Sequence, residues 1–155
     1  MDAPKFDVRR ETRNRNLLIA GIVIIVLVAI GIASWSLDIP WQLWHWPQDR
    51  RLNNFFAAVQ SGDLQKAYGL WNNDPDWQQH PDQYKVYDFA TFQKDWGPQS
   101  DYGVIKSHNI VIAHRVGNGV VIGVNINGGK TPIFLRVDNK TKTIGFSPVE
   151  LYLGP

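Results

Sequence analysis

The feature that most constrains this chain is an uncharged apolar run near its N-terminus, from Asn16 through Leu37. As a helix at about 1.5 Å per residue, these 22 residues span roughly 33 Å, enough to cross a hydrocarbon core of about 30 Å. A helix in the core of a soluble protein would show a polar face, and this run shows none. Lipid forces the backbone to hydrogen-bond within the segment, so its many Ile and Val residues do not prevent a helix. The sequence therefore predicts one transmembrane helix at residues 16–37.

Positive charge lies on one side of this span. Five Lys and Arg residues occur within residues 1–15, and the next ones along the chain are Arg50 and Arg51. The positive-inside rule then places the tail in the cytoplasm and the following domain outside. We expect a single-pass protein of a cell inner membrane, in contact with membrane lipid, with its C-terminal domain periplasmic or extracellular. The residues predicted to set this topology are Lys5, Arg9, Arg10, Arg13 and Arg15.

A cleaved signal peptide is the alternative interpretation of the same segment. Gly31 and Ala33 are small residues at the right spacing for cleavage before Ser34. The length of the apolar run and the three acidic residues in the preceding tail favour an uncleaved anchor. Ala29 and Ala33 also form a small-xxx-small pair that could seat another helix, although such pairs are common in ordinary spans.

Four of the seven tryptophans lie in the short stretch between Ser34 and Pro47. Indole rings prefer the headgroup region, where the apolar ring is buried and the N–H stays hydrated. Pro40 and Pro47 are expected to interrupt the helix, so residues 38–48 are predicted to form a Trp-rich interfacial linker. An aromatic platform for a sugar, quinone or pigment, with His45 as a ligand, is the alternative. The predicted membrane-interface residues are Trp35, Trp41, Trp44 and Trp46.

Composition excludes several classes of function. The chain has no cysteine, which rules out disulfides, thiolate metal sites and a cysteine nucleophile. The tail accounts for the formal net charge of +2, because acidic and basic residues balance in the rest of the chain. A neutral domain offers no electrostatic basis for binding nucleic acid, so none is expected as a partner. The sequence has no phosphate-binding loop, calcium loop or nucleophile elbow, and we expect no cofactor and no metal.

A compact domain is predicted at residues 49–155. Asp49 is predicted to cap a first helix that stops at Gly62, and Asp63 to cap a second helix directly after it. The apolar residues of both helices recur at i, i+3, i+4 and i+7, which is typical of one buried helix face. These faces are Leu52, Phe55, Phe56 and Val59 in the first helix, and Leu64, Ala67, Tyr68 and Trp71 in the second.

A loop at residues 72–87 is followed by a third helix and then by strands. Asp88 is predicted to cap the third helix, whose buried face holds Phe89, Phe92 and Trp96. Four segments rich in Val and Ile follow, separated by Gly and Asn turns, which predicts antiparallel strands. The predicted fold class is α+β, with three helices packed on a curved four-stranded antiparallel sheet. The predicted strand segments are residues 102–116, 120–127, 130–137 and 141–153.

This order of elements resembles the nuclear transport factor two-like superfamily, a cone-shaped, cystatin-like fold. The resemblance covers about residues 50–152 and is carried by FFAAVQSGDLQKAYGLW at 55–71, TFQKDWG at 91–97 and FLRVDNKTKTIGFSPVEL at 134–151. Helices and sheet enclose a conical pocket in this superfamily. Some members are isomerases, dehydratases or hydrolases, and many only bind ligands or partners. The resemblance therefore implies a cone-shaped domain with a pocket, and leaves its function open.

Candidate pocket residues follow from the resemblance and from strand alternation. The superfamily's enzymes use an aspartate, a histidine or a tyrosine pair, for which the candidates are Asp88, Asp101, Tyr87, Tyr102, His108 and His114. Alternation along the first strand places one set on a common face, and we predict these four as ligand-binding: Tyr102, His108, Ile110 and Ile112. His108 and His114 would lie about 20 Å apart on a strand, too far for one metal site. Spacing identifies no acid–base partner, so no catalytic residue is predicted.

The expected function is that of a non-enzymatic accessory or assembly subunit of a membrane complex, with other membrane-protein subunits as partners. The layout of basic tail, single span and outward domain is similar to the assembly-factor component of type IV secretion machines, although this domain is shorter. Binding of an apolar small ligand in the cone is one alternative. An isomerase or dehydratase that uses Asp101, Tyr102 or His108 as acid–base groups is another.

Overall fold

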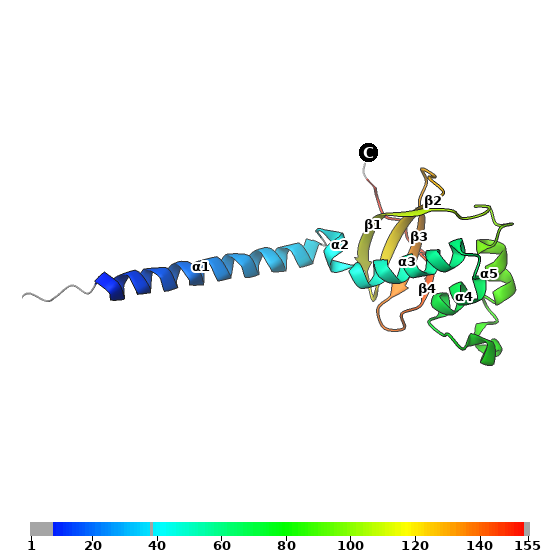
Figure 1. The fold of residues 1–155 in the computed structure, drawn as a ribbon, viewed down its shortest axis with the longest axis horizontal. Coiled ribbons are helices and arrows are strands. Elements are labelled where there is room, and N and C mark those ends of the chain that lie inside the picture. The colour runs from blue at the N-terminus through cyan, green and yellow to red at the C-terminus, as the bar shows by residue number, and fades with distance from the viewer. Residues whose placement is uncertain (1–7, 38, 154–155) are drawn as a thin grey trace, which may run out of the picture. The chain divides into compact units, whose positions relative to one another are not determined.

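The computed structural model describes residues 8–37 and 39–153, with the backbone alone for residues 8–11 and 41. The predicted topology residue Lys5 and the side chains of Arg9, Arg10 and Trp41 lie outside the described residues. The chain separates into two compact units, Met1–Ile39 and Pro40–Pro155. Its class is α+β, with one long apolar N-terminal helix and an open, four-stranded antiparallel sheet (Figure 1).

The first unit holds the helix α1 (Val8–Leu37). It covers the predicted span and also begins within the basic tail, where Arg and Glu are good helix formers. Its stretch Thr12–Leu37 is long and apolar enough to cross a membrane, and none of these residues is buried in the structure. The side chains of Arg13 and Arg15 are exposed on its first turns.

The second unit begins with α2 (Trp41–Trp44) and α3 (Trp46–Gln60), which occupy most of the predicted linker. The prediction that Asp49 caps the first domain helix is wrong, because His45 holds the cap position and Asp49 lies in the first turn. The predicted interruption at Pro47 is also wrong. Proline has no N–H to lose in a first turn and its fixed φ suits one, so α3 begins before it.

Local hydrogen bonds form the corner between α3 and α4 (Leu64–Asn72). Gly62 takes a φ of +78°, and the N–H of Asp63 donates to the carbonyl of Ala58 at 3.0 Å, which ends α3. The Asp63 carboxylate then accepts from the N–H of Lys66 at 3.0 Å and starts α4. The predicted stop at Gly62 and cap at Asp63 are confirmed.

Two short 3₁₀ helices, Trp77–Gln79 and Pro81–Tyr84, lie between α4 and α5 (Phe89–Trp96). Asp88 caps α5 by accepting from the N–H of Thr91 at 2.7 Å, as predicted.

The sheet has the order β1-β2-β3-β4, and every neighbouring pair is antiparallel. The first strand of the structure is shorter than the predicted segment 102–116, because residues 102–107 form a loop before it. The strands are β1 (His108–Val116), β2 (Gly119–Ile126), β3 (Ile133–Asp138) and β4 (Ile144–Phe146).

A register shift in β1 changes which residues face the core. Ile110 pairs with Val124, whereas Ile112 pairs with the next residue back, Gly123. This bulge turns Ile112 to the opposite face of the sheet from Ile110. The side chain of Ile112 lies over Gly123, where a Cβ would meet its Cγ2 at 2.9 Å. Beyond the bulge, Ala113 is the residue of β1 that joins the core.

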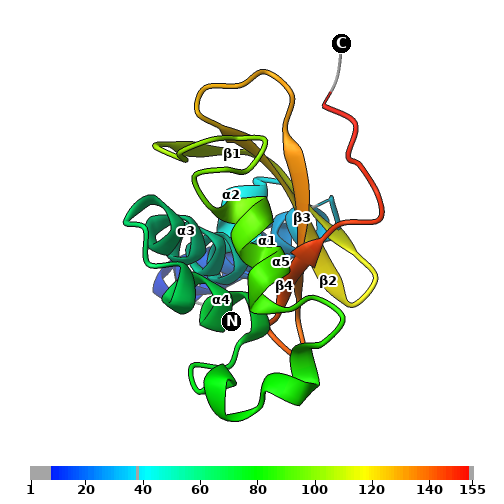
Figure 2. The ribbon, with the colours of Figure 1, turned by 90° about the vertical axis from the view of Figure 1, so that its right-hand side faces the viewer.

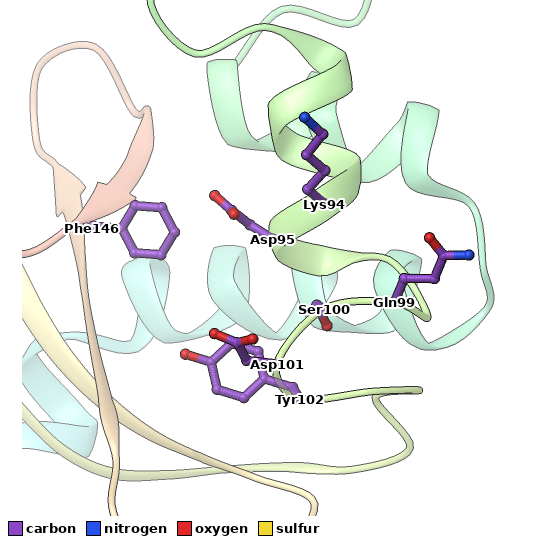
Figure 3. Close-up of a pocket in the computed structure, with 7 residues that line it drawn as sticks. All are labelled: Lys94, Asp95, Gln99, Ser100, Asp101, Tyr102 and Phe146. Carbon is purple, nitrogen blue, oxygen red and sulfur yellow. The ribbon is translucent and has the colours of Figure 1, made fainter.

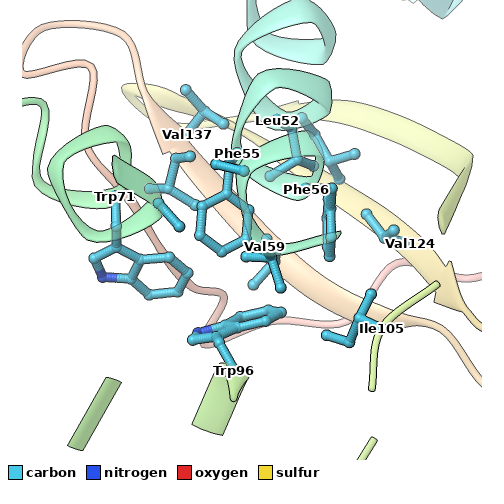
Figure 4. Close-up of a cluster of buried hydrophobic side chains, with 14 of the residues drawn as sticks. Leu52, Phe55, Phe56, Val59, Trp71, Trp96, Ile105, Val124 and Val137 are labelled. Carbon is cyan, nitrogen blue, oxygen red and sulfur yellow. The ribbon is translucent and has the colours of Figure 1, made fainter. Parts of the chain in front are cut away.

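One hydrophobic core is shared by α3, α4, α5 and all four strands (Figure 4). Figure 2 shows these three helices grouped beside the strands. Hydrogen bonds at both ends of α3 orient it across the sheet. Near its start, the Gln48 side chain donates to Asn139 beyond β3, and at its end, Gln60 is hydrogen-bonded to His108 at the start of β1. The apolar faces predicted for the three helices face this core. The largest fully buried side chains of the core are Trp96, Tyr68, Phe55, Phe56 and Phe92.

The close contact at the bulge yields a stability prediction. Gly123→Ala is expected to lower the free energy of unfolding by about 1–3 kcal/mol, because the new Cβ overlaps Ile112 and Phe134. Gly145→Ala in β4 is the matched control, since nothing lies within 4 Å of its Cβ position. Denaturant unfolding of the full chain in dodecyl maltoside measures both. Equal stability of the two variants, or no relief of Gly123→Ala by Ile112→Ala, would contradict this register.

The carboxyl group of Asp49 yields a second prediction. Burial raises the pKa of Asp49 to about 6, and its buried Oδ1 has no hydrogen-bond partner among the described residues. Because the unfolded pKa is lower, the wild type gains stability as pH falls through about 6 toward 4. We expect Asp49→Asn to be more stable than the wild type at pH 7.5, with an advantage that shrinks toward pH 4. An advantage that grows instead would show that the Asp49 carboxylate is stabilised by folding.

Candidate functional site

The four residues predicted to bind a ligand are not brought together. Tyr102 lies in the loop between α5 and β1 and is exposed. His108 and Ile110 lie in β1 and pack toward α3 and the core. The bulge turns Ile112 to the other face of the sheet. The predicted common face is therefore wrong, because strict alternation assumes an unbroken strand.

His108 is held between two amide side chains of α3. Gln60 Nε2 lies 2.8 Å from its Nδ1, and its Nε2 lies 2.8 Å from Asn53 Oδ1. The imidazole stacks on Phe56, with ring centroids 4.6 Å apart. A neutral ring satisfies both partners, accepting from Gln60 and donating to Asn53. Burial also lowers the pKa of His108, and this histidine links β1 to α3.

A cavity of about 460 Å³ opens beside α5 and is the candidate site (Figure 3). Asp95 comes from α5, Asp101 and Tyr102 from the loop after it, and Phe146 from β4. Figure 3 shows Asp95 directed toward Phe146, with Asp101 and Tyr102 together on the other side. It shows Lys94 and Gln99 directed away from these four side chains. The lining residues are Lys94, Asp95, Gln99, Ser100, Asp101, Tyr102 and Phe146.

The aromatic part of this site rests on the buried indole of Trp96. The ring of Phe146 lies nearly parallel to it, with centroids 5.9 Å apart, and that of Tyr102 lies 6.2 Å away. Phe146 and Tyr102 keep 51% and 38% of their surface exposed, so the two rings are available to a ligand. Trp96 also packs in the core, where the ring of Phe55 meets it edge-on with ring centroids 5.0 Å apart.

Tyr87 holds one of the two carboxylates. Its hydroxyl donates to Asp95 Oδ2 at 2.8 Å. Burial, followed by this hydrogen bond and the Asp95 charge, raises the pKa of Tyr87, so the phenol stays protonated and keeps donating. Burial and the charges of Asp101 and Asp95 also raise the pKa of Tyr102. Two carboxylates, those of Asp95 and Asp101, and one ammonium group, that of Lys94, line the cavity.

The remaining candidates from the sequence lie elsewhere. The carboxylate of Asp88 caps α5, and His114 lies on the exposed side of β1. His45 is buried at the cap position of α3. Within residues 8–37 and 39–153, no group of three or more His, Asp or Glu side chains is arranged to hold a metal ion.

Among the predicted interface tryptophans, Trp35 and Trp46 are exposed and Trp44 is partly buried. The guanidinium of Arg50 lies 5.5 Å from the centre of the Trp46 ring, within range of a cation–π contact. Contact of these residues with a membrane interface stays a prediction.

Sequence reasoning missed Asp95 and Phe146. Asp95 directly precedes the core residue Trp96, so helical periodicity places it at the edge of the buried face, where a carboxylate is unusual. Phe146 follows Ile144 by two residues, and strand alternation places it on the same face as that core residue. Each residue therefore had a local signal, but nothing local indicated that the two side chains line one cavity.

No family model, no curated protein and no solved structure matches this chain. The resemblance to the nuclear transport factor two-like superfamily therefore stays a prediction.

The environment of His108 predicts a pH dependence of stability. Its folded pKa lies below the unfolded value of about 6.5, so below that pH the unfolded chain binds a proton that the folded chain binds less readily. This contribution to stability is complete above pH 6.5 and is lost as pH falls below it. We expect the stability advantage of wild type over His108→Gln to shrink between pH 7.5 and 5.5 in denaturant unfolding.

His114→Gln is the matched control, because His114 is an exposed histidine of the same strand. It separates the effect of the buried His108 contacts from the effect of removing a histidine from β1. An advantage over His108→Gln that grows toward pH 5.5 would mean that His108 is stabilised as a cation, which contradicts the neutral hydrogen-bond pattern.

Proposed function

We propose that this chain is a single-pass membrane protein that displays a non-catalytic binding domain outside the cell's inner membrane. Its N-terminal tail lies in the cytoplasm, and its C-terminal domain acts as an accessory or assembly subunit of a membrane-protein complex. The domain is cone-shaped and of the nuclear transport factor two-like type.

The observation that carries the proposal is the uncovered apolar surface of α1. Leu, Ile and Val side chains are exposed on every side of it, and none of the stretch Thr12–Leu37 is buried. Removing one such side chain from water is worth about 1.5–3 kcal/mol, so a helix of this composition needs lipid or a partner around it. The basic residues before this stretch support a cytoplasmic N-terminus.

Among the three candidate acid–base groups, His108 supports the non-catalytic role, whereas Asp101 and Tyr102 line the cavity beside α5. His108 is bound to Asn53 and Gln60 and does not line the cavity beside α5. The core shared by three helices and four strands supports the cone, as does the bulge in β1, since a bulge bends the strand that carries it.

The absence of cysteine allows a direct test of membrane topology. Single-cysteine variants Ala3→Cys in the tail and Gln79→Cys in the domain are expressed in a bacterium and treated with a membrane-impermeant maleimide. We expect Gln79→Cys to be labelled in intact spheroplasts and Ala3→Cys only after lysis, with both chains at full length and resistant to carbonate extraction. Labelling of Ala3→Cys in intact spheroplasts would reverse the orientation. A shortened Gln79→Cys product would instead show cleavage after Ala33.

The subunit role is tested by purification from the native membrane in a mild detergent. We expect the same stoichiometric chains to co-purify with the wild type and with a variant whose α1 is replaced by an unrelated Leu/Ala span. Recovery of a lone monomer contradicts the proposal, and partners that follow only the native α1 would place the interaction in the membrane instead of the domain.

A further inference from the structure

Two carboxylates line the cavity beside α5, those of Asp95 and Asp101, and neither is ion-paired within the described part of the chain. Asp95 accepts from the neutral phenol of Tyr87. The ion pairs of the described domain use other carboxylates, those of Asp74 and Asp82. Among the described residues that line the cavity, Lys94 is the basic one, and in Figure 3 its side chain extends away from Asp95 and Asp101.

Exposed ring faces accompany these carboxylates. Phe146 and Tyr102 border the cavity, and both rings stack with the buried indole of Trp96, at interplanar angles of 8° and 25°. The face of an aromatic ring is electrically negative and attracts a cation that approaches within about 6 Å of its centre. Carboxylates and ring faces thus select the same sign of charge.

Other classes of ligand fit these groups less well. An anion would be repelled by Asp95 and Asp101, and a neutral apolar molecule would desolvate their carboxylates without compensation. A calcium ion takes about six to eight oxygen ligands, and two carboxylates fall short of that set. An organic cation needs only charge neutralisation and an apolar surface for its alkyl groups.

We propose that this cavity binds an organic cation, an alkylammonium or guanidinium group, with Asp95 and Asp101 as its counter-charges and Phe146 and Tyr102 as its aromatic walls. The inference rests on the proposed function of the domain as a non-catalytic binding module. Tyr87 positions Asp95, and Lys94 is the competing internal cation.

Binding is tested on the full chain labelled with ¹⁵N-tryptophan in dodecyl maltoside, by titration of the indole N–H signals. Trp96 is assigned with Trp96→Phe. The probes are choline and ethylguanidinium, with the neutral isosteres 3,3-dimethyl-1-butanol and ethylurea as controls. We expect saturable shifts at Trp96 with both cations, and at least about tenfold weaker binding of each isostere. Binding of the cations should weaken as salt is raised from about 0.05 to 0.5 M.

Variants separate the contributions of the groups. Asp95→Asn combined with Asp101→Asn should weaken choline binding at least about tenfold, and Phe146→Leu about two- to fivefold. Lys94→Gln should strengthen it, because the competing charge is removed. Asp76→Asn is the matched control, since Asp76 is exposed and does not line the cavity, and it should leave the affinity within about twofold.

The source of the cation is distinguished by a lysine-containing peptide and its alanine counterpart. Binding of the lysine peptide about tenfold tighter than choline would identify a protein side chain as the ligand, and equal or weaker binding would identify a free small cation. Either result supports a cation site. Equal affinity for cations and isosteres, no saturable shift with any probe, or no effect of the double Asn variant would overturn it. If that double variant co-purifies the same partners while cations fail to bind the wild type, the cavity proposal fails and the subunit role stands.

Discussion

The packing of one indole, that of Trp96, joins the core of this domain to its candidate site. The indole meets Phe55 of α3 edge-on at 5.0 Å, and Phe55 in turn contacts Phe56, Trp71 and Phe92. It also stacks with the exposed rings of Phe146 and Tyr102, whose centroids lie 5.9 and 6.2 Å away. Because interiors are packed as densely as organic crystals, the position of Trp96 is set by the whole cluster. The walls of the cavity therefore inherit the rigidity of the core, although their own surfaces are half exposed.

Sequence signals that act over a few residues predicted the fold well. The stop at Gly62 and the caps at Asp63 and Asp88 each depend on a hydrogen bond to a backbone group within five residues, so the local sequence contains all the required information. The cap assigned to Asp49 failed because two start signals, an acid and a preceding proline, lie two residues apart and only one can define the first turn.

The candidate site was less predictable, because it depends on register and tertiary contact. A single bulge between Ile110 and Ile112 reverses every face assignment beyond it, and bulges have no strong sequence signature. His108 matched the pattern of a pocket residue, yet its partners Asn53 and Gln60 lie about half the domain away in sequence and turn it into a strand–helix link. Asp95 and Phe146 come to line one cavity only after α5 and β4 are packed on the same core.

The proposed cation site and the proposed membrane anchor are linked by the affinity that such a site can reach. An open cavity that takes one cation is expected to bind weakly, since exposed ion pairs contribute about 0–1 kcal/mol each and exposed cation–π contacts about 0.5–1 kcal/mol. Such a site is of little use to a domain that diffuses freely. If α1 tethers the domain to the same membrane as a partner, the domain would meet that partner at an effective concentration that reaches the millimolar range for short flexible linkers. If both proposals hold, anchoring would make a weak and reversible contact sufficient.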